Sequence, residues 1–310
     1  MPEFVETTTI ERTIACRACG STDLVKDGLY GSSQYFLCRK CESKSAGTHS
    51  FPRMKHPRDR IVRAITNYFG GMSYRAISES FGQLEGSSVS KSSILNWVLK
   101  YSRLVNDYTL AFHPQLSDIW VADETAVFLW GQQYWFWDAI DAGTRFLVAS
   151  HLSRTRSMED AIKFFSMARW RSQTRPRLVL TDKMGAYYRA FNKVFYSSEP
   201  AHRVAHLTSE GFASESNINL IERFHGTLKQ RTKVMRDLKT KPTARIVLDG
   251  FVTNYNFLTH HGALKGRTPA QVANVGGKIG SWDDLIELGL RTPRQNPSAE
   301  LEWHQKFRIG

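Results

Sequence analysis

The sequence of 310 residues has only four cysteines and no long hydrophobic run. No stretch approaches the roughly 20 consecutive apolar residues that a transmembrane helix needs, so we expect no membrane span. The first residues, MPEFVETTTIERT, are polar and lack the apolar segment of a signal peptide. The sequence therefore predicts a soluble cytoplasmic protein.

Acidic residues are also in the minority, with 29 Asp and Glu against 42 Lys and Arg and a formal net charge of +13. Such an excess of positive charge favours a polyanionic partner, most often nucleic acid. The hydrophobic content of 41% is typical of a folded globular protein, and the length allows two or three domains. We therefore expect a multidomain protein that binds nucleic acid.

All four cysteines lie near the N-terminus, where Cys16, Cys19, Cys38 and Cys41 form two C-x2-C pairs with eighteen residues between them. Two such pairs joined by a hairpin can form the tetrahedral thiolate cage of a structural Zn²⁺ site. Two disulfides are the alternative, but a protein without a secretion signal would have difficulty keeping them oxidised. The sequence predicts a zinc ribbon over residues 10–55, in which the metal stabilises the fold.

Helical periodicity follows the ribbon, and three short helices are predicted within residues 56–112. Ser73 and Ser90 can cap the second and third of them. Three helices with a polar N-terminus on the last one resemble a helix-turn-helix module, although a plain helical bundle is the alternative. The candidate DNA contacts are exposed side chains of the third helix, namely Lys91, Ser92, Asn96 and Lys100.

Strand-like patterns begin after Pro114. We predict three strands, a helix, and a strand that runs into another helix, at residues 118–130, 133–141, 144–153, 157–170 and 176–191. This order indicates a mixed α/β domain over residues 113–275. Asp123 falls within the first strand and Asp182 at the end of the fourth. Taken singly, Asp123 could face solvent from an edge strand, and Asp182 could cap the helix that follows.

A third acid, Glu222, lies in a strongly basic helix. From Arg223 to Arg245 there are eight Lys and Arg residues and one acid, Asp237. The apolar residues of this helix share one stripe, and Glu222 lies beside it. A lone glutamate here could simply offset the charge of its neighbours.

Together the three acids indicate a metal site. If the first and fourth strands are neighbours, Asp123 and Asp182 share one site, and the basic helix can add Glu222. Clustered carboxylates repel one another unless cations neutralise them, so we expect bound Mg²⁺ or Mn²⁺, two ions per site, acting on a phosphate. The basic residues of the helix are then predicted to bind the DNA backbone: Lys229, Arg231 and Lys233.

These motifs resemble the DDE transposases, and more narrowly the bacterial and archaeal insertion-sequence transposases of the IS-six group. The matching stretches are WVADET, VLTDKMGAY and NLIERFHGTLKQRTK, and the likeness covers roughly residues 60–275. The resemblance implies an RNase H-like catalytic core after the zinc ribbon and the helix-turn-helix module. The gap between the second and third acids is longer than is typical, so Glu210 and Glu215 are rivals of Glu222.

The resemblance also implies a reaction. Activated water would cleave a phosphodiester at a transposon end, and the freed 3′-OH would attack target DNA at the same site. Family members act on terminal inverted repeats as homo-oligomers, at least dimers, which implies association with the nucleoid through DNA. Two other functions stay open: a DNA-binding regulator, and an RNase H-like nuclease that does not join strands. Residues 276–310 are a C-terminal tail to which we assign no role.

Overall fold

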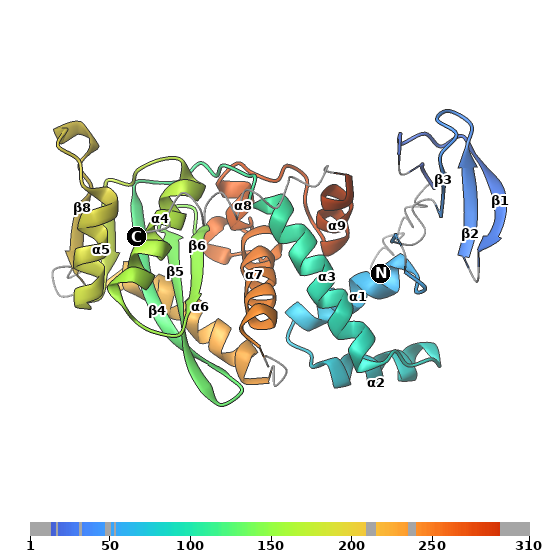
Figure 1. Ribbon diagram of the computed structural model, residues 1–310, viewed down its shortest axis with the longest axis horizontal. Helices are drawn as coiled ribbons and strands as arrows, with labels where there is room; N and C mark the ends of the chain where they lie inside the picture. Colours follow the sequence, from blue (N-terminus) through green and yellow to red (C-terminus); the bar gives the residue numbers. More distant parts are fainter. Residues whose placement is uncertain are drawn as a thin grey trace, which may run out of the picture. The chain divides into compact units, whose positions relative to one another are not determined.

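The computed structural model describes residues 14–16, 18–30, 33–46, 51–52, 54–208, 215–234 and 240–291. The chain forms two compact units, Met1–Ala64 and Ile65–Gly310 (Figure 1). None of the helices in the described ranges has the length and apolar character that a bilayer crossing needs.

The first unit contains a small antiparallel sheet of three strands. These are β1 (Leu24–Tyr30), β2 (Ser33–Cys38) and β3 (Lys44–Ser45), in the order β1-β2-β3. The first cysteine pair precedes β1, and the second begins at the last residue of β2. This arrangement is compatible with the zinc ribbon expected from the sequence.

The second unit is built on a mixed sheet in the order β6-β5-β4-β7-β8. Strands β4, β5 and β6 pair antiparallel, whereas β7 is parallel to β4 and β8 is parallel to β7. The prediction of an RNase H-like mixed sheet is therefore confirmed. The strands are β4 (Ile119–Leu129), β5 (Gln132–Asp141), β6 (Leu147–Ser153), β7 (Leu178–Thr181) and β8 (Ala205–Thr208).

The third predicted strand begins three residues later than we expected. The carboxylate of Asp141 accepts hydrogen bonds from Thr144, at 2.8 Å from the backbone nitrogen and 2.6 Å from Oγ1. These bonds close a turn, and Arg145 within it adopts a positive φ of 60°. The chain therefore returns to an extended conformation only at Leu147.

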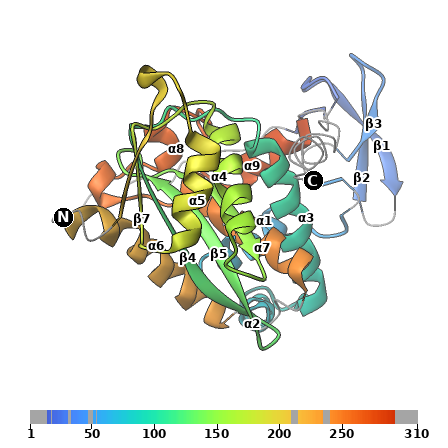
Figure 2. The same cartoon turned by 60° about the vertical axis from the view of Figure 1, so that its left-hand side comes forward.

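Helices cover both faces of this sheet. On one face lie α4 (Met158–Ser172) and α5 (Gly185–Phe195), side by side (Figure 2). These two helices pack over an aromatic core. On the other face lie α6 (Glu215–Val234) and α7 (Lys241–Leu258). Because side chains alternate along a strand, even-numbered residues of β4 face α4 and α5, and odd-numbered residues face α6.

The remaining helices are α1 (Arg58–Phe69), α2 (Tyr74–Glu85), α3 (Lys91–Thr109), α8 (Pro269–Val272) and α9 (Trp282–Arg291). Two short 3₁₀ turns complete the described elements, η1 (Pro200–His202) and η3 (Gly262–Leu264). The predicted caps are confirmed, since Ser73 and Ser90 each accept a backbone hydrogen bond at 3.1 Å.

The long helix α3 packs against both α7 and α9. Trp282, at the start of α9, stacks on Phe69 with ring centroids 4.8 Å apart and donates from Nε1 to Asn254 at 3.0 Å. Residues 282–291 therefore pack against other helices of the second unit. The sequence had given this segment no role.

We predict that Gly250→Ala destabilises the second unit. A Cβ at this position of α7 would lie 2.5 Å from Cζ of Phe69 and 2.6 Å from Oγ of Ser102. Overpacking of this kind typically costs about 1–3 kcal/mol, which urea unfolding would measure. Gly226→Ala in α6 is the matched control, because its Cβ would meet no atom within 4 Å. It should stabilise the protein by up to ~1 kcal/mol through helix propensity. A Gly250→Ala variant as stable as the wild type would contradict the packing described here.

Candidate active site

The ends of two neighbouring strands bring Asp123 and Asp182 together. Strand β7 runs parallel to β4 with Val121 opposite Leu180, and two residues further along Asp123 comes level with Asp182. Oxygen atoms of these two acids and of Glu124 lie within 4.8 Å of one another. Strand β4 lies in the middle of the sheet, so the alternative of an edge strand for Asp123 is wrong.

Asp182 also has a local contact, because its Oδ1 accepts a hydrogen bond from the backbone of Met184 at 2.9 Å, just before α5. This bond engages one oxygen and leaves the side chain 42% exposed. The contact partly resembles the helix cap considered from the sequence. It also aims the carboxylate at Asp123.

The charge of this acid cluster is poorly compensated. Burial raises the pKa of Asp123 to about 6, and the carboxylates of Asp138 and Asp182 add to this rise while His225 opposes it. A pKa so far above the ordinary value means that the ionised form lacks sufficient partners. Carboxylate oxygens are the donors that hard divalent cations prefer, so the pair of aspartates fits Mg²⁺ or Mn²⁺.

Glu124 is the acid that sequence reasoning missed. It points to the opposite face of β4 from Asp123, and its side chain is only 1% exposed. One oxygen accepts from the Tyr187 hydroxyl at 2.5 Å, and the other accepts from Arg156. Burial raises the pKa of Glu124 to about 7, against the effect of these two partners. Because both oxygens are engaged, Glu124 is less open to a cation than the two aspartates.

Helix α6 is attached to the sheet by a buried histidine. Nε2 of His225 lies 2.7 and 2.9 Å from the two carboxylate oxygens of Asp138, which is fully buried on β5. Nδ1 of the same ring lies 3.5 Å from Asp123. Burial disfavours the charged ring, but the carboxylates prevail and raise the pKa of His225. This side of α6 therefore faces the acid cluster.

Glu222 and Lys229 lie on the same side of α6 as His225, three residues before it and four after it. Both are exposed. Glu222 does not belong to the group of acids within 4.8 Å of one another. At 1.5 Å per residue, its Cα lies roughly 4.5 Å along the helix axis from that of His225.

The two rivals of Glu222 are less well defined. Glu215 is the first residue of α6, but its side chain lies outside the described part of the chain, and so does Glu210 entirely. The predicted apolar stripe of this helix is confirmed where it is described, since Ile221, Phe224 and Leu228 are buried.

The basic residues of α6 have different surroundings. Arg231 donates from Nη1 to the carbonyl of Gly70 at 2.5 Å, just after α1. This contact requires glycine at position 71, where φ is 110° and a Cβ would lie 1.5 Å from Nη1 of Arg231. Arg231 thus has a structural partner besides its predicted role with DNA. The side chain of Lys233 lies outside the described residues.

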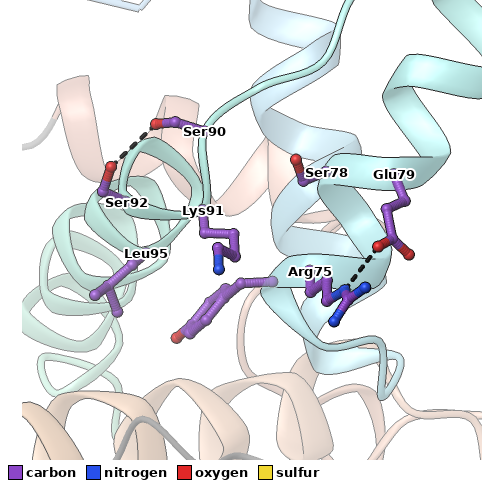
Figure 3. A pocket seen from close by; sticks show the side chains of 8 residues that line it. Arg75, Ser78, Glu79, Ser90, Lys91, Ser92 and Leu95 are labelled. Carbon is purple, nitrogen blue, oxygen red and sulfur yellow. Dashed lines mark hydrogen bonds and ion pairs between the residues drawn. The ribbon is translucent and has the colours of Figure 1, made fainter.

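The residues of α3 that the sequence predicts to contact DNA are all exposed. Lys91 and Ser92, at the first turn of α3, line a groove of about 710 Å³ against α2 (Figure 3). Arg75 and Glu79 form the α2 side of this groove and pair with each other at 2.7 Å. Asn96 and Lys100 are exposed further along α3.

The four cysteines converge as the sequence predicts. The Sγ atoms of Cys16 and Cys41 are 3.6 Å apart, as are those of Cys19 and Cys38, and all four lie within 4.8 Å. Sulfur atoms about 2.3 Å from a tetrahedral Zn²⁺ are separated by similar distances, whereas disulfide sulfurs are about 2.05 Å apart. The geometry favours the metal cage over the disulfide alternative.

The two cysteine pairs also have matching turns. Cys16 donates to the carbonyl of Ser21 and Cys38 to that of Ser43, each five residues later. The residues that follow the pairs, Gly20 and Glu42, both have positive φ, at 73° and 57°. Two copies of one turn, facing each other, are what a closed tetrahedral site requires.

Three comparisons place these observations beside known proteins. Residues 117–261 match a family model described as a DDE domain. No curated protein matches the chain. Among solved structures, two forms of the HTLV-2 integrase catalytic core domain in complex with magnesium, dimeric and trimeric, are similar at 18% and 17% identity, each with a TM-score of 0.40. These matches cover 52% of this chain and 98% and 99% of those chains.

A third solved structure is a simian T-cell lymphotropic virus intasome in complex with the PP2A regulatory subunit B56 gamma. The similarity has 15% identity and a TM-score of 0.37, and it covers 76% of each chain.

We predict that Cys38→Ser, or removal of zinc by a chelator, unfolds the N-terminal ribbon and leaves the second unit folded. The reason is that thiolate–metal bonds would supply most of the stability of so small a sheet. Metal analysis should find one zinc ion per chain, and the wild-type cysteines should resist alkylation. Ser45→Ala, in β3, is the control and should keep the metal. Four freely alkylated cysteines in the native wild type would exclude a zinc site.

Proposed function

We propose that this chain, of which residues 117–261 match a family model described as a DDE domain, is a DDE-type polynucleotidyl transferase and the transposase of an insertion sequence. It would bind terminal inverted repeats of double-stranded DNA, cleave a phosphodiester to free a 3′-OH, and join that hydroxyl to target DNA. The convergence of Asp123 and Asp182 beside the basic helix α6 carries this proposal.

Asp123, Asp182 and Glu222 would hold the divalent ions. When bound, two Mg²⁺ or Mn²⁺ ions would stabilise the attacking and leaving oxygens at the phosphate. The contact between His225 and Asp123 supports Glu222 as the third acid, because it places the adjacent turn of α6 beside the site. Glu215 lies ten residues before His225, about 15 Å away along the helix axis. Its position is therefore less favourable for a metal ligand than that of Glu222.

Basic residues of two elements would place the DNA. Lys229 lies on the side of α6 that faces the acid cluster and would contact the backbone near the cleaved bond, with Arg231 and Lys233 beyond it. Lys91, Ser92, Asn96 and Lys100 of α3 would contact the terminal repeat, in the manner of a recognition helix. Structural zinc would hold the N-terminal ribbon, and the active form would be a homo-oligomer, at least a dimer.

The acid cluster also bears on the two alternative functions. A DNA-binding regulator has no need of a poorly compensated Asp123, whose burial makes the ionised site costly. An RNase H-like nuclease would use the same acids but would not join strands. An assay that scores cleavage and strand transfer separately distinguishes this second alternative from a transposase.

We predict that Asp123→Asn, Asp182→Asn or Glu222→Gln abolishes both cleavage and strand transfer and leaves DNA binding intact or stronger. Each change keeps the shape of the side chain and removes the charge that would hold the ions, so losses of 100-fold or more are expected, equivalent to about 3 kcal/mol. Lys229→Ala should instead weaken placement of the DNA end without loss of metal affinity. Gel shifts and strand-transfer assays with Mg²⁺ or Mn²⁺ would separate these effects.

Two outcomes would contradict this assignment. If Glu222→Gln is fully active and Glu215→Gln is not, then Glu222 is not the third acid. If all three acid variants remain active, these acids do not catalyse the reaction. A DNA-binding regulator then becomes the better explanation of the protein's function.

We also predict that Lys91→Ala and Lys100→Ala each weaken binding to the terminal repeat and reduce its salt dependence by about one phosphate contact, a change of roughly one in the log–log slope. Lys163→Ala, on an exposed position of α4, removes the same charge away from α3 and should leave the slope unchanged. Unchanged slopes for both α3 variants would place the DNA-binding surface elsewhere.

A further inference from the structure

Arg156 lies at the edge of the acid cluster, in the short connection between β6 and α4. Its guanidinium stacks over the ring of Trp135, 4.2 Å from the centroid, and donates to the buried carboxylate of Glu124. The same guanidinium is 4.0 Å from Oδ2 of Asp182. We propose that Arg156 binds the phosphate group undergoing cleavage, and that Glu124 and Trp135 hold its guanidinium in position. This inference rests on the proposed polynucleotidyl transfer.

The guanidinium has donors to spare. An arginine carries five N–H donors, and within the described part of the chain Arg156 uses one of them in its hydrogen bond to Glu124. The side chains of Arg156 and Asp182 are 37% and 42% exposed, so both reach the open side of the cluster. A phosphate oxygen next to Asp182 would therefore lie within reach of the remaining donors.

Glu124 and Trp135, which hold Arg156, are themselves fixed by buried contacts. Glu124 is fixed in turn by Tyr187, which is fully buried, and Trp135 packs against the core of the sheet. Donors that are already in place when charge develops on a phosphate stabilise the transition state without rearrangement. Arginine also matches the geometry of phosphate oxygens, which it can bind through two parallel hydrogen bonds.

The stability of the fold gives only a weak reason for the ion pair between Arg156 and Glu124. A buried ion pair is often no more stabilising than apolar residues of similar volume, because both charges lose their hydration. Here the pair also leaves an acid next to Asp123 and Asp182, with oxygen atoms of all three within 4.8 Å of one another. A role in binding the substrate accounts for both features.

The test compares three variants. Arg156→Gln removes the guanidinium but leaves Glu124 without its cation, so Glu124→Gln/Arg156→Gln removes both charges together. Arg154→Gln is the matched control, because Arg154 is also stacked on a ring, Tyr134 at 5.1 Å, and is bonded to the carbonyl of Gln133 at 2.7 Å. Cleavage and strand transfer would be measured with Mg²⁺, DNA affinity with Ca²⁺ at several salt concentrations, and thermal unfolding without DNA.

We expect Arg156→Gln to slow cleavage by about 100-fold or more, as loss of one preorganised donor does. The double variant should unfold at a higher temperature than Arg156→Gln yet cleave no faster, and its salt slope for DNA binding should fall by roughly one. Arg154→Gln should stay within about threefold of the wild type in cleavage and keep the salt slope.

Recovery of wild-type cleavage by the double variant would overturn the proposal, because Arg156 would then only neutralise Glu124. Equal effects of Arg156→Gln and Arg154→Gln would overturn it as well. If the wild type cleaves no DNA, the proposed function fails instead. DNA binding measured with Ca²⁺ then still tests whether Arg156 contacts a phosphate. The proposed contact is excluded if the double variant and Arg154→Gln have the same DNA affinity and salt slope.

Discussion

The buried contact between His225 and Asp138 fixes α6 against the sheet, and the geometry of the acid site depends on it. Asp138 is fully buried, so removal of its partner would leave a carboxyl group without compensation. Loss of one member of such a pair typically costs about 3–5 kcal/mol. Because the same ring reaches Asp123, this contact sets both the rotation and the height of α6. The positions of Glu222 and Lys229 relative to the sheet depend on the same contact.

A second constraint is the alternation of side chains along β4. Asp123 and Glu124 are neighbours in the chain but face opposite sides of the sheet, so they have different partners. Asp123 meets His225 from α6, whereas Glu124 meets Tyr187 from α5. A shift of one residue in the pairing of β4 would exchange these surroundings. The register with β5, in which Asp123 lies opposite Asp138, is therefore as important to the site as the acids themselves.

Much of the fold could be predicted because its signals are local. The caps at Ser73 and Ser90 follow from residue type within one turn of helix, and the buried apolar stripe of α6 follows from helical spacing. The meeting of Asp123 and Asp182 was predictable only on the condition that their strands are neighbours, which sequence reasoning could state but not establish.

The parts that could not be predicted depend on contacts between distant segments. Arg156 is 32 residues from Glu124, Tyr187 is 63 residues from Glu124, and His225 is 87 residues from Asp138. No periodicity in a single sequence marks such pairs. The late start of β6 is a different case, because a side chain of Asp141 competes with the strand for the backbone of the turn. The packing of α9 was likewise invisible, since its partners Phe69 and Asn254 come from two remote helices.

The uninterrupted helix α3 has a mechanical consequence. Its 19 residues extend about 28 Å, from the exposed first turn at Lys91 to a C-terminal part packed against α7 and α9. A helix packed in this way behaves as a rigid rod, so its exposed first turn keeps a constant separation from the sheet that carries the acids. If α3 holds DNA at that end, as proposed, the cut would fall a fixed number of base pairs from the bound sequence. A variable cut site would then require α3 to bend or its packing against α7 and α9 to loosen.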